Sequence, residues 1–131
     1  MADEAQIQQS ININNSTTGF KVQSVNTSYK DTVTGSSGPV PGMVIATTAG
    51  LSITFTGLTT PGWCELVNLD ITNFVEYGIW DGSTFHELGE LPPSTAQGGK
   101  PQIIKLSRNM TGLRLKADTA NCDVQVKAYE V

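Results

Sequence analysis

The chain has 131 residues, of which 38% are apolar and 15% are charged, and its formal net charge is −4. This length suits one ordinary domain with a single core, and the composition, rich in Thr, Ser, Asn and Gly, argues against a helical bundle, a coiled coil or a wholly disordered chain. The acidic balance argues against nucleic acid as the main partner. No apolar run approaches the roughly 20 residues of a membrane span, and the acidic, polar start predicts no targeting segment.

Residues 1–34 are predicted to form a polar N-terminal arm. A sparse strand covers residues 6–14, a turn follows at 14–19, and a second polar strand covers 20–29. The apolar side chains of this arm are candidates for contact with another protein subunit: Ile7, Ile11, Ile13, Phe20 and Val22. Two arrangements are open, because the arm could add a strand to a neighbour or form a polar edge strand of its own sandwich.

Residues 35–131 are predicted to form a single β-sandwich or jelly-roll-like domain, and the whole chain is expected to be all-β with eight to ten short strands. The loop at 34–42 holds three Gly and two Pro, so it is not expected to be a core strand. A turn is expected at 59–62 and a loop at 91–101, and no segment predicts a helix. The strands are expected at residues 43–47, 51–56, 63–68, 74–80, 85–88, 103–106, 113–117 and 122–128.

Polar residues mark several sharp turns between these strands. Their side chains can accept hydrogen bonds from backbone N–H groups or donate to backbone carbonyls, and Gly tolerates the positive φ that a hairpin turn requires. These residues are therefore predicted to serve the fold and not a ligand: Asn68, Asp70, Asn73, Asp81, Gly82 and Asp118.

The charges are unevenly distributed along the chain. Between Asp31 and Gly99 there are no Lys or Arg residues but seven acids, whereas cations outnumber acids from Lys100 onward. Two interpretations are open. The basic C-terminal strands can pair with the acidic central strands inside one sheet, or the acidic face of one copy can meet the basic face of another, as in a ring.

No motif predicts catalysis, a metal site or a cofactor. His86 is the only histidine, and no nucleophile stands at a recognisable spacing from it. Cys64 and Cys122 lie in predicted strands without a CxxC or Cys/His cluster, so both are expected to be free and buried. The glycines form no phosphate-binding loop.

Three aromatic residues have two open interpretations. Trp63, Tyr77 and Trp80 lie in or at the ends of predicted strands, where aromatic rings commonly close a core or form a subunit contact. Exposed rings on a β-sandwich could instead stack on sugar rings.

The second part of the chain contains a set of motifs that together carry a resemblance to known proteins. The set consists of GPVPG at 38–42, TPGW at 60–63, NLDITNFVEYG at 68–78, Phe85, the Leu91-Pro92 turn, GLRLKADTA at 112–120 and the strand with Val124 and Val126. With these motifs the chain from about residue 35 onward resembles small structural proteins encoded with the capsid and tail genes of tailed bacteriophages. The resemblance covers about three-quarters of the chain.

The resemblance implies a non-enzymatic virion protein, made in the host bacterial cytoplasm. The expected role is a decoration or cement protein that stabilises the head shell by contacts to several major capsid subunits, as a trimer or another symmetric homo-oligomer. Direct contact with nucleic acid or a membrane is not expected. The alternatives are a neck or tail component of the virion and, from another class, a carbohydrate-binding module.

Overall fold

The computed structural model describes residues 4–10, 12–23, 27–32, 38–97, 101–107, 110 and 112–130. The chain divides into two compact units, Met1–Thr34 and Gly35–Val131. The first unit is called the arm and the second the body.

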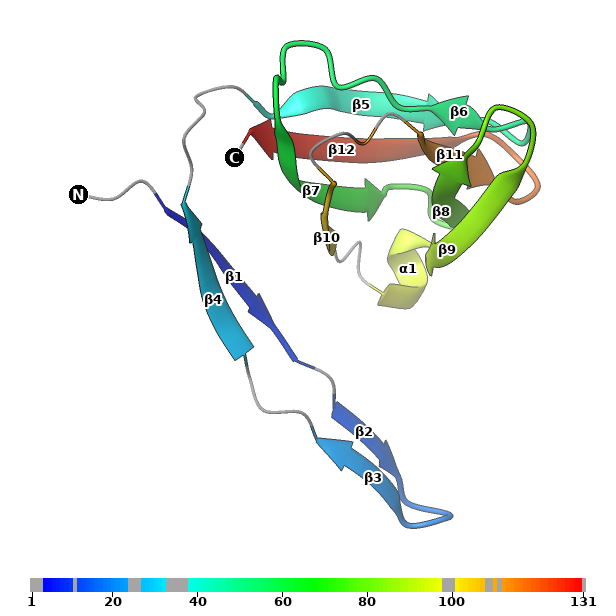
Figure 1. Ribbon diagram of the computed structural model, residues 1–131. Helices are drawn as coiled ribbons and strands as arrows, with labels where there is room; N and C mark the ends of the chain where they lie inside the picture. Colours follow the sequence, from blue (N-terminus) through cyan, green and yellow to red (C-terminus); the bar gives the residue numbers. More distant parts are fainter. Residues whose placement is uncertain are drawn as a thin grey trace. The chain divides into compact units, whose positions relative to one another are not determined.

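The arm consists of antiparallel strand pairs that together trace a β-hairpin (Figure 1). Its strands are β1 (Glu4–Gln9), β2 (Asn12–Asn15), β3 (Phe20–Gln23) and β4 (Thr27–Thr32). Within the described residues β1 pairs with β4 and β2 pairs with β3, so each predicted arm strand is divided in two. The described arm strands form two-stranded sheets of their own.

The turn between β2 and β3 is stabilised by a side chain. Asn15 Oδ1 accepts hydrogen bonds from the backbone N–H groups of Thr17 and Thr18, at 3.0 and 3.1 Å. Gly19 follows with φ of 71°, a conformation that Gly adopts without strain. The polar turn predicted at residues 14–19 therefore lies at the tip of the hairpin.

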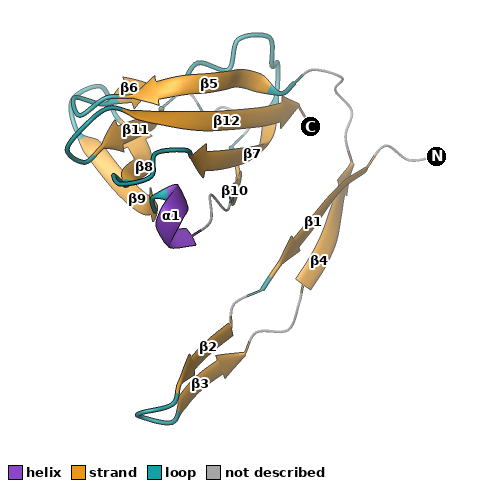
Figure 2. Cartoon of the chain, turned by 180° about the vertical axis from the view of Figure 1, so that it is seen from behind, coloured by secondary structure: helices purple, strands orange, loops and turns teal. Residues whose placement is uncertain are grey.

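The described part of the body contains eight strands in two four-stranded sheets (Figures 1 and 2). They are β5 (Val40–Ala46), β6 (Leu51–Ser52), β7 (Pro61–Asn68), β8 (Val75–Trp80), β9 (Phe85–Leu91), β10 (Gln102–Lys105), β11 (Leu113–Ala117) and β12 (Cys122–Glu130). The sheet orders are β10-β7-β12-β5 and β6-β11-β8-β9, and the strand pairs are antiparallel. Every connection except β8–β9 crosses between the sheets, which is jelly-roll connectivity. The predicted all-β sandwich is confirmed.

The core lies between the two sheets and is built by alternation along the strands. In β11, Leu113, Leu115 and Ala117 are buried, whereas the residues between them are partly exposed. The buried positions of β12 follow the same period of two, because successive strand side chains point to opposite faces. The core cluster is Ala46, Ile53, Cys64, Leu66, Val75, Leu91, Leu106, Leu113, Leu115, Ala117, Cys122, Val124, Val126 and Ala128.

Two strands begin earlier than predicted, inside segments rich in Pro and Gly. β5 begins at Val40, within the predicted loop, and its register pairs Pro41 with Lys127 of β12. Since β5 is an edge strand, Pro41 can lack an N–H group without losing a ladder hydrogen bond. β7 begins at Pro61, within the predicted turn, and the Gly62 carbonyl accepts a hydrogen bond from the Leu106 N–H at 2.7 Å.

Three other segments differ from the prediction by more than two residues or in type. The strand expected at 51–56 is reduced to β6. Ile53 lies beyond β6 but is buried, and its N–H still donates to the Leu113 carbonyl at 2.9 Å. β9 extends to Leu91 through a register shift opposite Tyr77 and Gly78. The predicted loop at 91–101 contains one helical turn, α1 (Ser94–Gln97), where no helix was expected.

Opposite charges from the two halves of the sequence meet inside the sheets. Lys116 of β11 lies opposite Glu76 of β8, with Nζ and Oε2 3.7 Å apart. Lys127 of β12 lies opposite Glu65 of β7. The uneven charge distribution is thus used, at these positions, for cross-strand pairs within one molecule.

Candidate functional site

The turn between β7 and β8 is organised by three polar side chains. Asn68, 2% exposed, donates hydrogen bonds from Nδ2 to the Asn73 carbonyl at 2.8 Å and to the Leu91 carbonyl at 3.1 Å. Its Oδ1 accepts from the Asp70 N–H at 3.0 Å. Asp70 Oδ1 in turn accepts from the N–H groups of Thr72 and Asn73, at 2.8 and 2.6 Å. The side chains satisfy backbone groups that the turn leaves without ladder partners.

The same turn is connected to two neighbouring loops. The Ser94 N–H at the start of α1 donates to the Asp70 carbonyl at 2.8 Å, and Thr95 Oγ1 donates to the Ile71 carbonyl at 2.6 Å. From the β11–β12 loop, Thr119 Oγ1 donates to Asn73 Oδ1 at 2.6 Å. Asp118 takes part through its backbone N–H, which donates to the Phe74 carbonyl at 3.2 Å. These contacts fix the loop and have the pattern of a structural element.

The hydrogen bonds also set the charge state of Asp70. The N–H groups of Asn73 and Thr72 bond the ionised carboxylate and hold the pKa of Asp70 below its usual range. Asp70 is consequently an anion throughout the neutral range, and it acts as a turn cap that does not exchange protons there.

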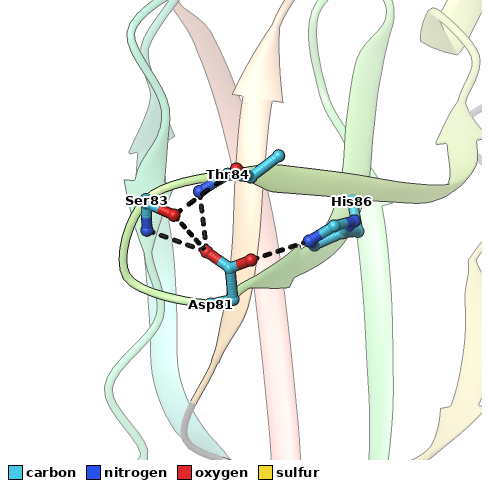
Figure 3. Close-up of polar contacts among 4 residues, drawn as sticks. All are labelled: Asp81, Ser83, Thr84 and His86. Carbon is cyan, nitrogen blue, oxygen red and sulfur yellow. Dashed lines mark hydrogen bonds and ion pairs between the residues drawn. The ribbon is translucent and has the colours of Figure 1, made fainter.

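Asp81 organises the β8–β9 turn in the same way (Figure 3). Its Oδ1 accepts from the N–H groups of Ser83 and Thr84, at 2.8 and 2.7 Å, and from Ser83 Oγ at 3.0 Å. Its Oδ2 lies 2.9 Å from His86 Nε2. The contact with His86, followed by those with the backbone of Thr84 and Ser83, lowers the pKa of Asp81 far below its usual range. Gly82 completes the turn with φ of 104°.

The three side chains Asp81, Ser83 and His86 do not form a hydrolytic triad. In such a triad the imidazole lies between the hydroxyl and the carboxylate, so that it can take the hydroxyl proton. Here the carboxylate lies between the other two groups, since Ser83 Oγ and His86 Nε2 both contact Asp81 (Figure 3). The arrangement caps a turn and provides no base for the hydroxyl.

The structure does not bring the three candidate aromatic rings together. Trp63 in β7 is 6% exposed, with Lys105 Nζ 5.2 Å from its ring centre. Tyr77 in β8 packs against the core. Trp80, also in β8, is partly exposed, and the Arg114 guanidinium lies 4.0 Å from its ring centre. Trp63 and Trp80 belong to different sheets, so the rings do not form a common stacking platform.

The candidate contact residues of the arm are placed in two groups. Ile7 in β1 is buried, whereas Ile13 and Val22 lie opposite each other in β2 and β3, with exposed fractions of 45% and 38%. Around this pair is a shallow concavity of about 280 Å³ that Asn12, Asn14 and Lys21 also line. Phe20 lies in β3 opposite Asn15, and Ile11 lies outside the described residues.

Both cysteines are free and buried, as predicted. Burial raises the pKa of the Cys64 thiol to about 12 and also raises the pKa of Cys122. A buried thiol with a raised pKa is a poor nucleophile.

The described part of the chain contains no cluster of three or more His, Cys, Asp or Glu side chains that could hold a metal ion. In the same residues, no helix has the length and apolar character needed to cross a membrane.

One surface was not anticipated from the sequence, the outer side of β5. Met43 and Ile45 are 58% and 55% exposed, next to each other on one strand face. The signal was present, because residues 43–46 are apolar at every position, and a strand of that kind has one apolar face that the core of its own sheet cannot cover.

No family model, curated protein or solved structure shows significant similarity to the chain.

Proposed function

We propose that the chain is a non-enzymatic structural protein of a tailed-phage virion, located on the head shell as a decoration or cement protein. The observation that carries the proposal is a structural difference between the two units. The body has a complete core, whereas the arm is a self-paired hairpin that exposes the apolar pair Ile13 and Val22. Such an arm is suited to contact with another protein surface.

The fold is compatible with this role. Eight-stranded jelly rolls are frequent among viral capsid proteins and lectins. The polar clusters of the body cap turns, and the only histidine contacts the Asp81 carboxylate, so these groups support the fold. The mechanism we propose is mechanical. Contacts to several major capsid subunits add binding free energy, and multivalent attachment holds even when each contact is weak.

Copy number in purified particles is the direct test. Quantitative mass spectrometry of particles from the phage that encodes the chain gives its ratio to the major capsid protein. A ratio on the order of one per capsid subunit supports decoration of the whole shell. A small fixed number of copies supports a neck or tail component instead, and absence from the particle contradicts a virion role.

The arm can be tested separately on shells that lack the chain. We expect Ile13→Asp/Val22→Asp to abolish binding, because the change places two charges on the exposed apolar pair. The matched control is Gln6→Glu/Gln8→Glu, which adds the same charge to exposed residues of β1 that do not line the concavity around Ile13 and Val22. Equal binding of both variants contradicts the role of the arm.

A carbohydrate-binding module is less well supported. Trp63 is buried, Tyr77 packs on the core, and one face of Trp80 is covered by Arg114. Glycan binding that is lost in Trp80→Ala with the fold intact would favour that class over the virion role.

A further inference from the structure

The outer side of strands β5 and β12 carries an exposed apolar row beside a charged row. We call it the β5–β12 face, and it consists of Pro41, Met43, Ile45, Asp123, Gln125 and Lys127. In β5 the buried or partly buried positions alternate with exposed ones, which include Met43 and Ile45. In β12 the residues between Cys122, Val124, Val126 and Ala128 point away from the core. Both rows therefore lie on the outer side of the same sheet.

The apolar row lies on an edge of the sheet. Within the described residues, β5 pairs with β12 on one side only. Proteins commonly protect such edges with charged side chains or Pro on the strand. β5 has Pro41 near one end, but it has no charged residue beside Met43 and Ile45. A single exposed apolar residue is ordinary. Two large ones at successive outward-facing positions of an edge strand indicate a contact surface.

The charged row has an order that is complementary to itself. The strand register places Asp123 beside Ile45, Gln125 beside Met43 and Lys127 beside Pro41. From Asp123 to Lys127 the β12 row is negative, neutral and positive. In a second copy that runs in the opposite direction, each charge of the row therefore faces a charge of the opposite sign. The two charges are four residues apart, or about 13 Å along the strand.

Two copies can stack their sheets face to face about a two-fold axis that passes by Gln125 and is perpendicular to the strands. The charges of the two β12 rows are then matched. The axis brings Asp123 of each copy to Lys127 of the other, so that both ion pairs form at once. It also brings Met43 to Met43 and Ile45 to Pro41, so the apolar rows meet along their length. A two-fold interface requires this kind of self-complementary patch.

The outer side of the other sheet lacks this property. Its β11 row carries Arg114 and Lys116, two cations that would meet cations in the same kind of contact. Arg114 is already engaged with Trp80, Ser52 Oγ and the Ala49 carbonyl. Charge complementarity therefore distinguishes the β5–β12 face.

We propose that the β5–β12 face binds the same face of a second copy of the chain, with the two sheets stacked and the β12 strands antiparallel. The inference concerns the isolated protein and does not rest on the virion role. A two-fold contact gives dimers or even-numbered assemblies, a different symmetry from the trimer that the resemblance implies.

The test is the molar mass of the full-length chain by sedimentation equilibrium, with charge reversals on the face. We expect the wild type to form dimers, and Asp123→Lys or Lys127→Asp to weaken self-association about tenfold or more, since each creates two like-charge contacts. The double variant Asp123→Lys/Lys127→Asp is expected to restore the dimer. An equimolar mixture of the two single variants is also expected to restore it, because every pair is then complementary.

The matched control is Lys116→Asp. Lys116 lies opposite Glu76 as Lys127 lies opposite Glu65, so this variant reproduces the like-charge pair inside the molecule without altering the β5–β12 face. We expect it to keep the dimer. Met43→Asp provides an independent variant, because it places two carboxylates together at the axis, and it is expected to dissociate the dimer.

Several results would overturn the proposal. A wild type that is monomeric up to its solubility limit means that the arm or another protein covers the face. A trimer or dimer whose molar mass is unchanged by the charge reversals means that the copies contact each other through another surface. Loss of self-association in the single variants without recovery in the double variant or in the mixture excludes the self-complementary contact.

Discussion

The arm and the body have the same kind of backbone pairing but differ in what their side chains bury. In both units antiparallel strands exchange ladder hydrogen bonds. In β11 and β12 every second side chain lies in a core between two sheets. In β2 all four residues are exposed, and among the arm side chains whose burial is described Ile7 is the buried apolar one.

The difference shows which interaction stabilises each unit. Protein hydrogen bonds replace hydrogen bonds to water, so their net contribution is small, and isolated two-stranded hairpins are marginally stable at best. Burial of apolar surface contributes about 25 cal/mol per Å², and among the side chains that the structure describes it is the body that buries such surface over many residues. The body is therefore expected to fold cooperatively, whereas the arm depends more on contacts with other proteins.

The largest effect is expected at the centre of the core. Leu115→Ala removes a fully buried side chain and should lower the free energy of unfolding by about 2–5 kcal/mol. Urea unfolding followed by tryptophan fluorescence measures it. Leu88→Ala, at a position 65% exposed, is the control and should change stability by less than about 0.5 kcal/mol. Equal losses would contradict the assignment of the core.

A smaller effect is expected at the β7–β8 turn. Asn68→Ala leaves the Asn73 and Leu91 carbonyls and the Asp70 N–H without their partner, which should cost about 1–3 kcal/mol. The same urea titration measures the change. Asn121→Ala, at an exposed position, is the matched control and should stay near the wild-type value. An unchanged Asn68→Ala protein would show that the turn does not depend on this side chain.

The alternation of apolar residues was enough to predict the class of fold and most of the body strands. Leu113, Leu115 and Ala117, like the β12 series, lie in the core because period two is a local property of the chain. Pro and Gly were less informative. Pro41 and Pro61 lie within strands, since an edge position or a first position tolerates them, and neither position can be recognised before the sheet order is known.

The candidate surfaces were less predictable, because they depend on pairing between distant segments. Asn68, Asp70 and Asn73 could be recognised as turn residues from their local spacing. The Trp80–Arg114 contact and the alignment of Asp123 and Lys127 with Ile45 and Pro41 depend on strand register. Register follows from the whole sheet and is not encoded in any one motif.

Acid is expected to remove the stability that the turn carboxylates contribute through their hydrogen bonds. The folded state lowers the pKa of Asp70, so this group contributes stability that is complete above its unfolded pKa of about 3.9 and is lost as the pH falls through the folded value. In Asp70→Asn this contribution is absent at every pH. We therefore expect the stability difference between wild type and variant to shrink below about pH 4, and Asp81→Asn to behave in the same direction. Thermal unfolding across this pH range measures it, and a constant difference would contradict the role of the carboxylate.

The smallest effect on the stability of the body is expected from the arm. Ile13 and Val22 form one exposed cross-strand pair, which stabilises a hairpin by roughly 0.2–1 kcal/mol. Ile13→Ala/Val22→Ala should therefore speed amide hydrogen exchange in β2 and β3 and leave exchange in β11 and β12 unchanged, because the arm and the body are separate compact units. If the body strands lose protection as well, the two units unfold together, and the contrast between a self-sufficient body and a dependent arm does not hold.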